Sequence, residues 1–221
     1  NVCTVEDPIE MIAPEFNQMQ VQSNIDLSFA AGVRTLLRQD PDIIMIGEIR
    51  DLETAEMAVQ ASLTGHLVLS TLHTNDAPSA VTRLLDLGVP HYLIQSTLNG
   101  VIAQRLVRRL CPHCKTVGDV DAAEWEVLVG RMGLPKPARG ALPKGCHHCR
   151  NTGYLGRSAI YEILPISADL RKSISKDLDL PAFQQIALKE GMRPLRYAAA
   201  EMVARGITTI REVIEVLPPS D

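Results

Sequence analysis

Two pairs of cysteines constrain the fold of this chain more than any other feature. They are Cys111-Pro-His-Cys114 and Cys146-His-His-Cys149, and both have the Cys-x-x-Cys spacing. A knuckle of this spacing turns tightly enough to aim two thiolates at one ion, and two knuckles supply the four ligands of a tetrahedral structural site. The spacing therefore predicts one structural Zn²⁺ bound by Cys111, Cys114, Cys146 and Cys149. The fold must then bring two distant segments of the chain together.

The residues around the knuckles leave an alternative, in which the four thiols are free and buried. Gly145 and Gly153 favour the metal site, because glycines suit the tight turns that two coinciding knuckles require. Nearby histidines could replace a thiolate, but four cysteines already complete the shell. We therefore expect His113, His147 and His148 to be exposed. Paired Cys-x-x-Cys motifs in such a chain indicate metal rather than disulfides, and hence a reducing compartment.

Composition narrows the class of protein. The chain has 221 residues, 46% of them apolar, which suffices for one large domain or two smaller ones. The net charge is −4 with acids and bases interspersed, so we expect no nucleic-acid binding. The longest apolar runs, 43–46 and 67–69, are too short to span a bilayer, and no signal peptide opens the chain. The fifth cysteine, Cys3, lies in an apolar segment and is expected to be a small buried hydrophobe.

The first half of the chain alternates strand and helix patterns, which predicts an α/β fold with a parallel, doubly wound sheet. Asp26 and Asp51 are the expected N-caps of the first two helices. The segment 42–46 is continuously apolar, as in a central strand covered on both faces. In chain order we expect a strand over 2–5, a helix over 26–39, a strand over 42–46, a helix over 51–63, a strand over 66–72 and a helix over 78–87.

The second half is expected to hold the metal module and a helical tail. The segment 98–110 is predicted to be a helix with Arg105, Arg108 and Arg109 on a solvated face. A metal module over 111–149 contains an insert rich in proline and glycine, a strand covers 158–164, and three or four short helices follow. The expected domains are 1–110, the metal module over 111–157, and a strand with a helical subdomain over 158–221.

An acidic residue follows the apolar strand in 42–51 (DIIMIGEIRD). A strand that delivers a carboxylate at its C-terminal edge is the Walker B arrangement, where the magnesium and attacking water of a nucleotide would lie. Gly47 stands where many P-loop proteins place an Asp, which leaves Glu48 as the acid. An ordinary core strand with a solvated end is the alternative.

Polar groups gather around the neighbouring strands as well. Glu6, Asp7 and Glu10 follow the strand over 2–5, while 61–66 and 70–75 place hydroxyls and histidines at both ends of the strand over 66–72. A solvated loop is the alternative for the acids. A hydrogen-bonded structural histidine is the alternative for His66.

On these segments the chain resembles the type II secretion and type IV pilus assembly ATPases. Residues 5–10 look like their Asp box, 42–51 like their Walker B segment and 64–74 like their His box, and the cysteine pairs look like their tetracysteine module. The resemblance covers nearly the whole chain and implies a RecA-like P-loop NTPase core. The pilus-retraction branch generally lacks the tetracysteine module, so its presence points to secretion or pilus extension.

The resemblance also implies roles for single residues. Glu6 would polarise or orient the attacking water, with Asp7 close to the metal and its waters. Glu48 would hold Mg²⁺ through water or share the role of general base. His73 would contact or sense the γ-phosphate of ATP.

Two further residues at this expected nucleotide site have open alternatives. Arg50 would pair with Asp51 or Glu48, or reach across a subunit boundary. His66 would contribute to the site or only order the start of its strand.

The resemblance implies an ATP-hydrolysing motor, with type II secretion favoured over type IV pilus extension. It would act as a ring, expected to be a hexamer, in the cytoplasm at the inner membrane. Its partners would be an inner-membrane platform protein and the cytoplasmic domain of a bitopic membrane adaptor. A non-catalytic, zinc-stapled interaction module is the rival hypothesis.

The phosphate-binding loop of such a motor does not occur in the chain. No Gly-x-x-x-x-Gly-Lys-Ser/Thr motif is present, and the chain begins at Asn1 in a strand-like segment without an initiator Met. We expect a fragment whose phosphate-binding loop lies upstream, and which by itself does not hydrolyse ATP.

Overall fold

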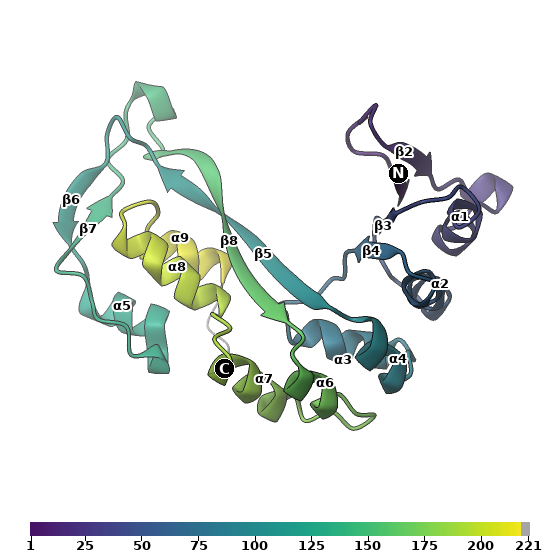
Figure 1. The fold of residues 1–221 in the computed structure, drawn as a ribbon. Coiled ribbons are helices and arrows are strands. Elements are labelled where there is room, and N and C mark those ends of the chain that lie inside the picture. The colour runs from purple at the N-terminus through teal and green to yellow at the C-terminus, as the bar shows by residue number, and fades with distance from the viewer. Residues whose placement is uncertain (218–221) are drawn as a thin grey trace. The chain divides into compact units, whose positions relative to one another are not determined.

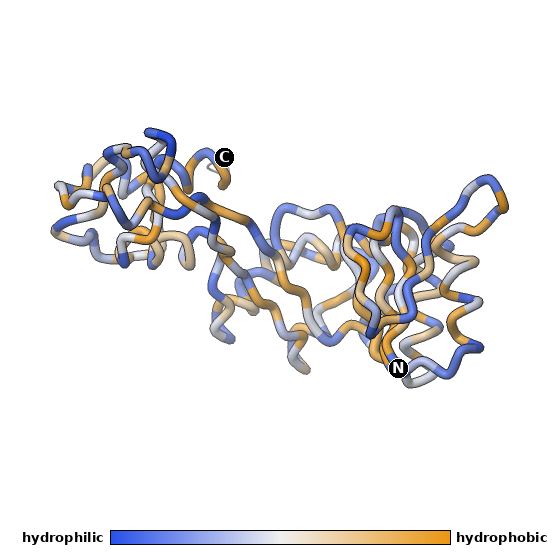
Figure 2. The backbone as a smooth tube through the Cα atoms, turned by 90° about the horizontal axis from the view of Figure 1, so that it is seen from above, coloured by the Kyte–Doolittle hydropathy of each residue, from blue (hydrophilic) through white to orange (hydrophobic). Residues whose placement is uncertain are grey.

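Four parallel strands form a sheet in the order β2-β1-β3-β4 (Figure 1). The inner strands are β1 (Val2–Glu6) and β3 (Ile43–Ile46), and the edge strands are β2 (Asn17–Gln20) and β4 (Leu67–Ser70). Val5 lies opposite Ile46 in register, and both are fully buried. Figure 2 shows hydrophobic residues along the strands next to the N-terminus, as expected for inner strands. The predicted α/β class and the parallel sheet are confirmed.

The computed structural model describes residues 1–217, which divide into two compact units. Unit 1 comprises 1–101 and 165–187 and holds the parallel sheet, and unit 2 comprises 102–164 and the chain from 188 onward. The units are defined by compactness alone. The division by function into 1–110, 111–157 and 158–221 stays a prediction.

The helices α1 (Phe29–Leu36) and α2 (Leu52–Leu63) contact each other and the sheet. Asp51 caps α2 as predicted, because its side chain accepts a hydrogen bond from the backbone N–H of Thr54. The predicted cap of α1 was wrong. Ser28, not Asp26, has extended backbone directly before the helix and accepts from the N–H of Ala31. Asp26 instead ends the 3₁₀ turn η1 (Ser23–Ile25) in the left-handed conformation, where Asp is tolerated.

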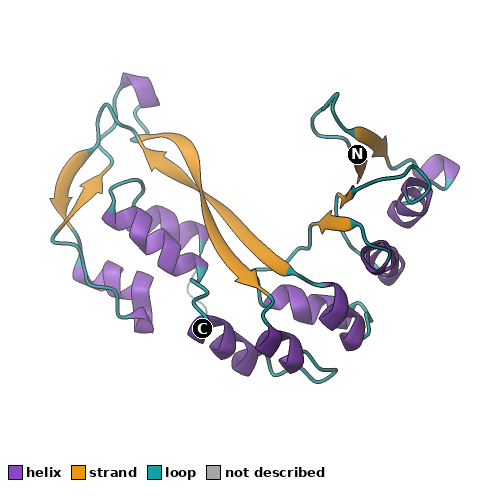
Figure 3. Cartoon of the chain, viewed as in Figure 1, coloured by secondary structure: helices purple, strands orange, loops and turns teal. Residues whose placement is uncertain are grey.

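Four more helices lie wholly or largely in unit 1 (Figure 3): α3 (Ser79–Asp86), α4 (His91–Thr97), α6 (Ala168–Ser173) and α7 (Leu180–Lys189). The guanidinium of Arg171 on α6 donates to the carbonyls of Gln95 and Leu98. The amide of Gln95 on α4 in turn donates to the carbonyl of Ile174, at 2.7 Å. These bonds join α6 to α4 although the two helices are far apart in the sequence.

Unit 2 is built around two long paired strands, β5 (Gly100–Leu110) and β8 (Tyr154–Pro165). The predicted helix over 98–110 was therefore wrong. Ala103, Val107 and Leu110 are the buried residues of β5, and their spacing also suits one face of a helix. Pairing with β8 decides in favour of the strand, since the sequence of β5 alone is compatible with both.

The insert of unit 2 has more structure than its proline and glycine content suggested. It contains the antiparallel hairpin of β6 (Thr116–Asp119) and β7 (Arg139–Leu142), the helix α5 (Ala122–Val129) and the 3₁₀ turn η2 (Gly130–Met132). The helix α5 buries Trp125 and contacts α8 (Leu195–Ala204) and α9 (Ile210–Val216). With α6 and α7, these two complete the short helices expected after residue 167. None of the helices formed by residues 1–217 has the length and hydrophobicity of a transmembrane span.

Candidate functional site

The carboxyl ends of three neighbouring strands place two acids and a histidine along one edge of the sheet. Glu6 is the last residue of β1, Glu48 follows β3 by two residues, and His73 follows β4 by three. Since β1, β3 and β4 are parallel, their ends meet at the same edge, where open α/β sheets bind ligands. The structure brings His73 and Glu48 into contact, with 3.2 Å between Nε2 and Oε2.

Glu48 is held by a forked ion pair with Arg50. The Nε and one terminal nitrogen of Arg50 donate to the two carboxylate oxygens, the second at 2.6 Å. The side chain of Glu48 is 14% exposed, whereas that of His73 is 87% exposed. The hydrogen bonds from Arg50, more than the contact with His73, lower the pKa of Glu48 below its ordinary value. Glu48 is thus ionised, and of the alternatives for Arg50 the structure shows the pair with Glu48.

Gly47 explains why the acid stands at position 48. Its N–H donates to the carbonyl of Val5 at 2.8 Å, and its carbonyl accepts from the hydroxyl of Thr71 at 2.6 Å. A Cβ atom at position 47 would lie 3.2 Å from the Val5 carbonyl oxygen, which belongs to the backbone of β1. An aspartate at this position would therefore crowd the neighbouring strand, while Glu48 projects from the next residue.

Glu6 is held by two donors that bind the same carboxylate oxygen. The hydroxyl of Thr4 donates to Oε1 at 2.6 Å, and the side-chain amide of Gln18 donates to it at 2.9 Å. Thr4 lies two residues earlier on β1 and so shares the face of Glu6, which strand periodicity alone could have revealed. Gln18 could not have been found in this way, because β2 was not predicted.

The other two residues expected to bind the cofactor lie in different surroundings. Asp7 is exposed and close enough to Arg50 to contribute, after Glu48, to the raised pKa of that guanidinium. His66 precedes β4 and so lies at the opposite edge of the sheet, about 13 Å from the end of a four-residue strand. Its Nδ1 is 2.9 Å from the carbonyl oxygen of Ala61 and 3.1 Å from the hydroxyl oxygen of Thr64. The structure does not bring His66 together with Glu48 and His73, and these contacts favour the structural alternative for it.

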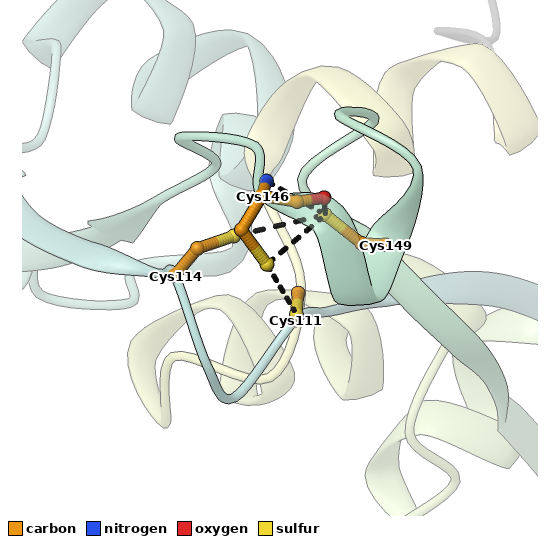
Figure 4. Close-up of side chains that lie close together, drawn as sticks. All are labelled: Cys111, Cys114, Cys146 and Cys149. Carbon is orange, nitrogen blue, oxygen red and sulfur yellow. Dashed lines mark hydrogen bonds between the residues drawn. The ribbon is translucent and has the colours of Figure 1, made fainter.

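The four predicted cysteines converge in unit 2 (Figure 4). Their sulfur atoms all lie within 4.8 Å of one another, and the Sγ–Sγ distances for Cys111–Cys146, Cys114–Cys149 and Cys146–Cys149 are 3.9, 3.8 and 3.8 Å. A tetrahedral ZnS₄ site with Zn–S bonds of about 2.3 Å requires sulfur separations of about 3.8 Å. A disulfide requires about 2.05 Å. The cluster therefore has the dimensions of a zinc site and holds no disulfide.

Backbone groups favour a thiolate at one of these positions. The N–H groups of Cys146 and Gly153 both donate to the sulfur of Cys149 at 3.2 Å. Burial opposes ionisation of this thiol, but the donors outweigh it and lower its pKa to about 6. Burial has the larger effect at Cys114 and raises its pKa to about 11. Metal ligation requires deprotonated thiols, and the thiol of Cys149 loses its proton more readily than that of Cys114.

The turns around the cluster also fit the sequence-based expectations. Gly145 has a φ of +96°, and a Cβ atom there would lie 2.8 Å from the carbonyl oxygen of Asn151. Only glycine avoids this clash while adopting a left-handed φ. His113, His147 and His148 are exposed as predicted, with the rings of His113 and His148 stacked at a centroid distance of 4.2 Å. Cys3 is fully buried in β1, also as predicted.

The chain is similar to known proteins over nearly its whole length. Residues 1–215 match the family model described as Type II/IV secretion system protein. The chain is 56% identical, over 99% of its length, to the type IV pilus assembly ATPase TfpB of Acinetobacter baylyi, and 48% identical, over 98%, to the type II secretion system protein HxcR of Pseudomonas aeruginosa. It spans only 37% and 42% of these two relatives. A crystal structure of the pilus retraction motor PilT with bound ADP matches 98% of the chain and 52% of that protein, with a TM-score of 0.67 and 28% identity.

Proposed function

The chain belongs to the type II/IV secretion system protein family, and we propose that it is part of an ATP-hydrolysing motor that drives assembly of a secretion pseudopilus or a pilus. The observation that carries this proposal is the placement of Glu6, Glu48 and His73 at the carboxyl edge of three adjacent parallel strands. Phosphoryl transfer to water needs a positioned nucleophile and charge compensation at the γ-phosphate, and these three side chains have the chemistry for both tasks.

In this mechanism each residue has a distinct role. Glu6 accepts a hydrogen bond from the attacking water and orients it, with Asp7 near the metal and its waters. Glu48 would hold Mg²⁺ through water or share the role of general base, and His73 would contact or sense the γ-phosphate. Bound Mg²⁺ would compensate the charge of the phosphates, and carboxylate oxygens are the ligands it prefers.

Arg50 holds the orientation of Glu48. Its forked bond engages both carboxylate oxygens, and each oxygen can accept a further hydrogen bond, such as one from a water of Mg²⁺. The other role considered for Arg50, reaching across a subunit boundary, would require its guanidinium to leave Glu48. The partly exposed position of Arg50 is compatible with such a movement.

The four-cysteine cluster is proposed to bind one structural Zn²⁺. The donor set is four thiols, their separations fit tetrahedral geometry, and no open position remains for a substrate. The metal would join the turn after β5 to the turn before β8 without taking part in ATP hydrolysis.

Type II secretion is the role that the sequence favours, and pilus extension is a second candidate favoured by a specific observation. The identity to the pilus assembly ATPase TfpB is 56%, against 48% for the secretion protein HxcR. In either role we propose a cytoplasmic ring, expected to be a hexamer, that binds an inner-membrane platform protein and the cytoplasmic domain of a bitopic adaptor. Deletion of the gene and complementation would separate the two roles, because loss of surface pili and loss of exported protein are scored independently.

The test of the enzymatic proposal is steady-state ATPase activity and nucleotide affinity of the full-length oligomeric protein. Glu6→Gln and Glu48→Gln should each slow turnover on the order of a hundredfold or more, with little change in ATP binding. His73→Ala should lower turnover by less. Wild-type rates for both Gln variants would show that the acids are only a solvated sheet edge. A full-length protein without a Gly-Lys-Ser/Thr loop would favour the non-catalytic interaction module.

A further inference from the structure

Gln18 uses every polar atom of its side chain at the base of the β1–β2 connection. Its Oε1 accepts from the backbone N–H of Ala13 at 2.7 Å. Its Nε2 donates to the carboxylate of Glu6 at 2.9 Å and to the carbonyl of Met11 at 3.0 Å. An N–H group can only donate, whereas a carbonyl and a carboxylate can only accept, so one orientation of the amide satisfies all three partners.

The sheet register places this amide beside Glu6. Gln18 on β2 is the register partner of Thr4 on β1, and Glu6 lies two residues further on the same face of β1. Thr4 and Gln18 thus approach Glu6 from two different strands. Both donate to Oε1, and no residue within 1–217 donates to the second oxygen, which can therefore accept a hydrogen bond from water.

We infer that Gln18 is a positioning residue for Glu6, fixing the rotamer in which the second carboxylate oxygen faces the attacking water. This inference rests on the role proposed for Glu6. It also links that role to the connection between β1 and β2, because the same amide holds the backbone at Met11 and Ala13. Met11 and Ile12 in this connection are 76% and 83% exposed. Because Gln18 is bonded to this connection and to Glu6, a movement of the connection would also move the amide that donates to Glu6.

The chain contains a matched control for this role. Gln20 lies on the same strand and its Oε1 accepts from the backbone N–H of Ile9, at 3.3 Å. Within residues 1–217, however, its amide makes no hydrogen bond to Glu6. Substitution of each glutamine by methionine removes the amide while keeping the length of the side chain. Gln18→Met loses the bond to Glu6 together with the bonds to Ala13 and Met11, whereas Gln20→Met loses only the bond to Ile9, so the control reports the effect of losing a glutamine amide on this strand without loss of the bond to Glu6.

The experiment measures kcat, KM for ATP and thermal stability in the full-length protein. Gln18→Met should lower kcat roughly tenfold to a hundredfold with KM unchanged, because misplacement of a catalytic group costs rate rather than affinity. Gln20→Met should keep the wild-type kcat. In the Glu6→Gln background, Gln18→Met should cause no further loss, since a positioning residue has nothing left to position.

The outcomes separate this inference from the proposed function. If Glu6→Gln is slow but Gln18→Met hydrolyses ATP at the wild-type rate, the inference is wrong and the proposed function stands. A further loss from Gln18→Met in the Glu6→Gln background, or equal losses in Gln18→Met and Gln20→Met, would show a merely structural role. Wild-type turnover of Glu6→Gln would overturn this inference together with the role proposed for Glu6, while the role of Glu48 would still be tested by Glu48→Gln.

Discussion

At the scale of single residues, a charge pair of unit 2 joins Arg108 on β5 to Glu212 on α9. The backbone N–H of Arg108 donates to one oxygen of Glu212 at 2.8 Å, and its Nε donates to the other at 2.6 Å. Glu212 is buried, and the guanidinium also lies 4.5 Å from the ring centre of Tyr154. Burial raises the pKa of Glu212, but the bonds from Arg108 outweigh burial, so the pKa is lowered overall.

This pair predicts how stability depends on pH. A carboxyl whose pKa is lower in the folded state stabilises the fold above its unfolded pKa of about 4.3, and the contribution is lost as the pH falls through the folded pKa. Glu212→Gln should therefore lower the free energy of unfolding by about 2 kcal/mol at pH 7 and by less in acid. Urea unfolding at pH 7 and at acidic pH measures the difference.

Glu215 offers the control for that measurement. It approaches Arg108 at 3.3 Å, but its side chain is 58% exposed. Glu215→Gln should change stability by less than about 0.5 kcal/mol, because exposed ion pairs contribute little. Equal effects of the two substitutions, or an effect of Glu212→Gln that does not shrink in acid, would contradict the assignment.

At the scale of elements, one cysteine knuckle follows β5 and the other precedes β8. The N–H of Cys111 donates to the carbonyl of Gly153 at 2.9 Å, so the turn after β5 already contacts the start of β8. A metal ion would turn this contact into a strong link between elements that are far apart in the sequence.

We predict one zinc ion per chain, measured by elemental analysis of metal-replete protein. Cys146→Ser should lose the metal and lower the melting temperature of unit 2. A loss of about 2 kcal/mol in the free energy of unfolding lowers the melting temperature by roughly 8 to 16 °C for a unit of this size. Cys3→Ala is the control, because Cys3 is buried in the sheet of unit 1 and should not affect the zinc content. Unchanged zinc content in Cys146→Ser would sink the assignment.

At the scale of the whole molecule, the 221-residue chain carries the acids of a nucleotide site but no Gly-Lys-Ser/Thr loop. The backbone N–H groups of such a loop supply most of the affinity for phosphate. The isolated chain should therefore show no measurable ATPase activity and at best weak nucleotide binding in a calorimetric titration. Robust hydrolysis by the isolated chain, abolished by Glu48→Gln, would show that the loop is not required.

The sequence by itself determined the features that depend on neighbours a few residues away. The cap of α2 by Asp51, the turn at Gly145 and the Cys-x-x-Cys knuckles are all local, because the interacting groups lie three to six residues apart along the chain. The alternation of β1, α1, β3, α2, β4 and α3 in unit 1 was predicted for the same reason, whereas β2 and α4 were not predicted. The position of the acids at one edge of the sheet was predicted from that alternation, because parallel strands present their carboxyl ends at the same edge.

Only the tertiary structure decided the features that depend on a distant partner. The segment 100–110 is a strand because β8 supplies its hydrogen bonds, and its own buried positions suit a helix equally well. The strand β2 exists through its pairing with β1, and this pairing brings Gln18 to Glu6. Such contacts join residues whose separation along the chain carries no pattern, so periodicity and capping cannot reveal them.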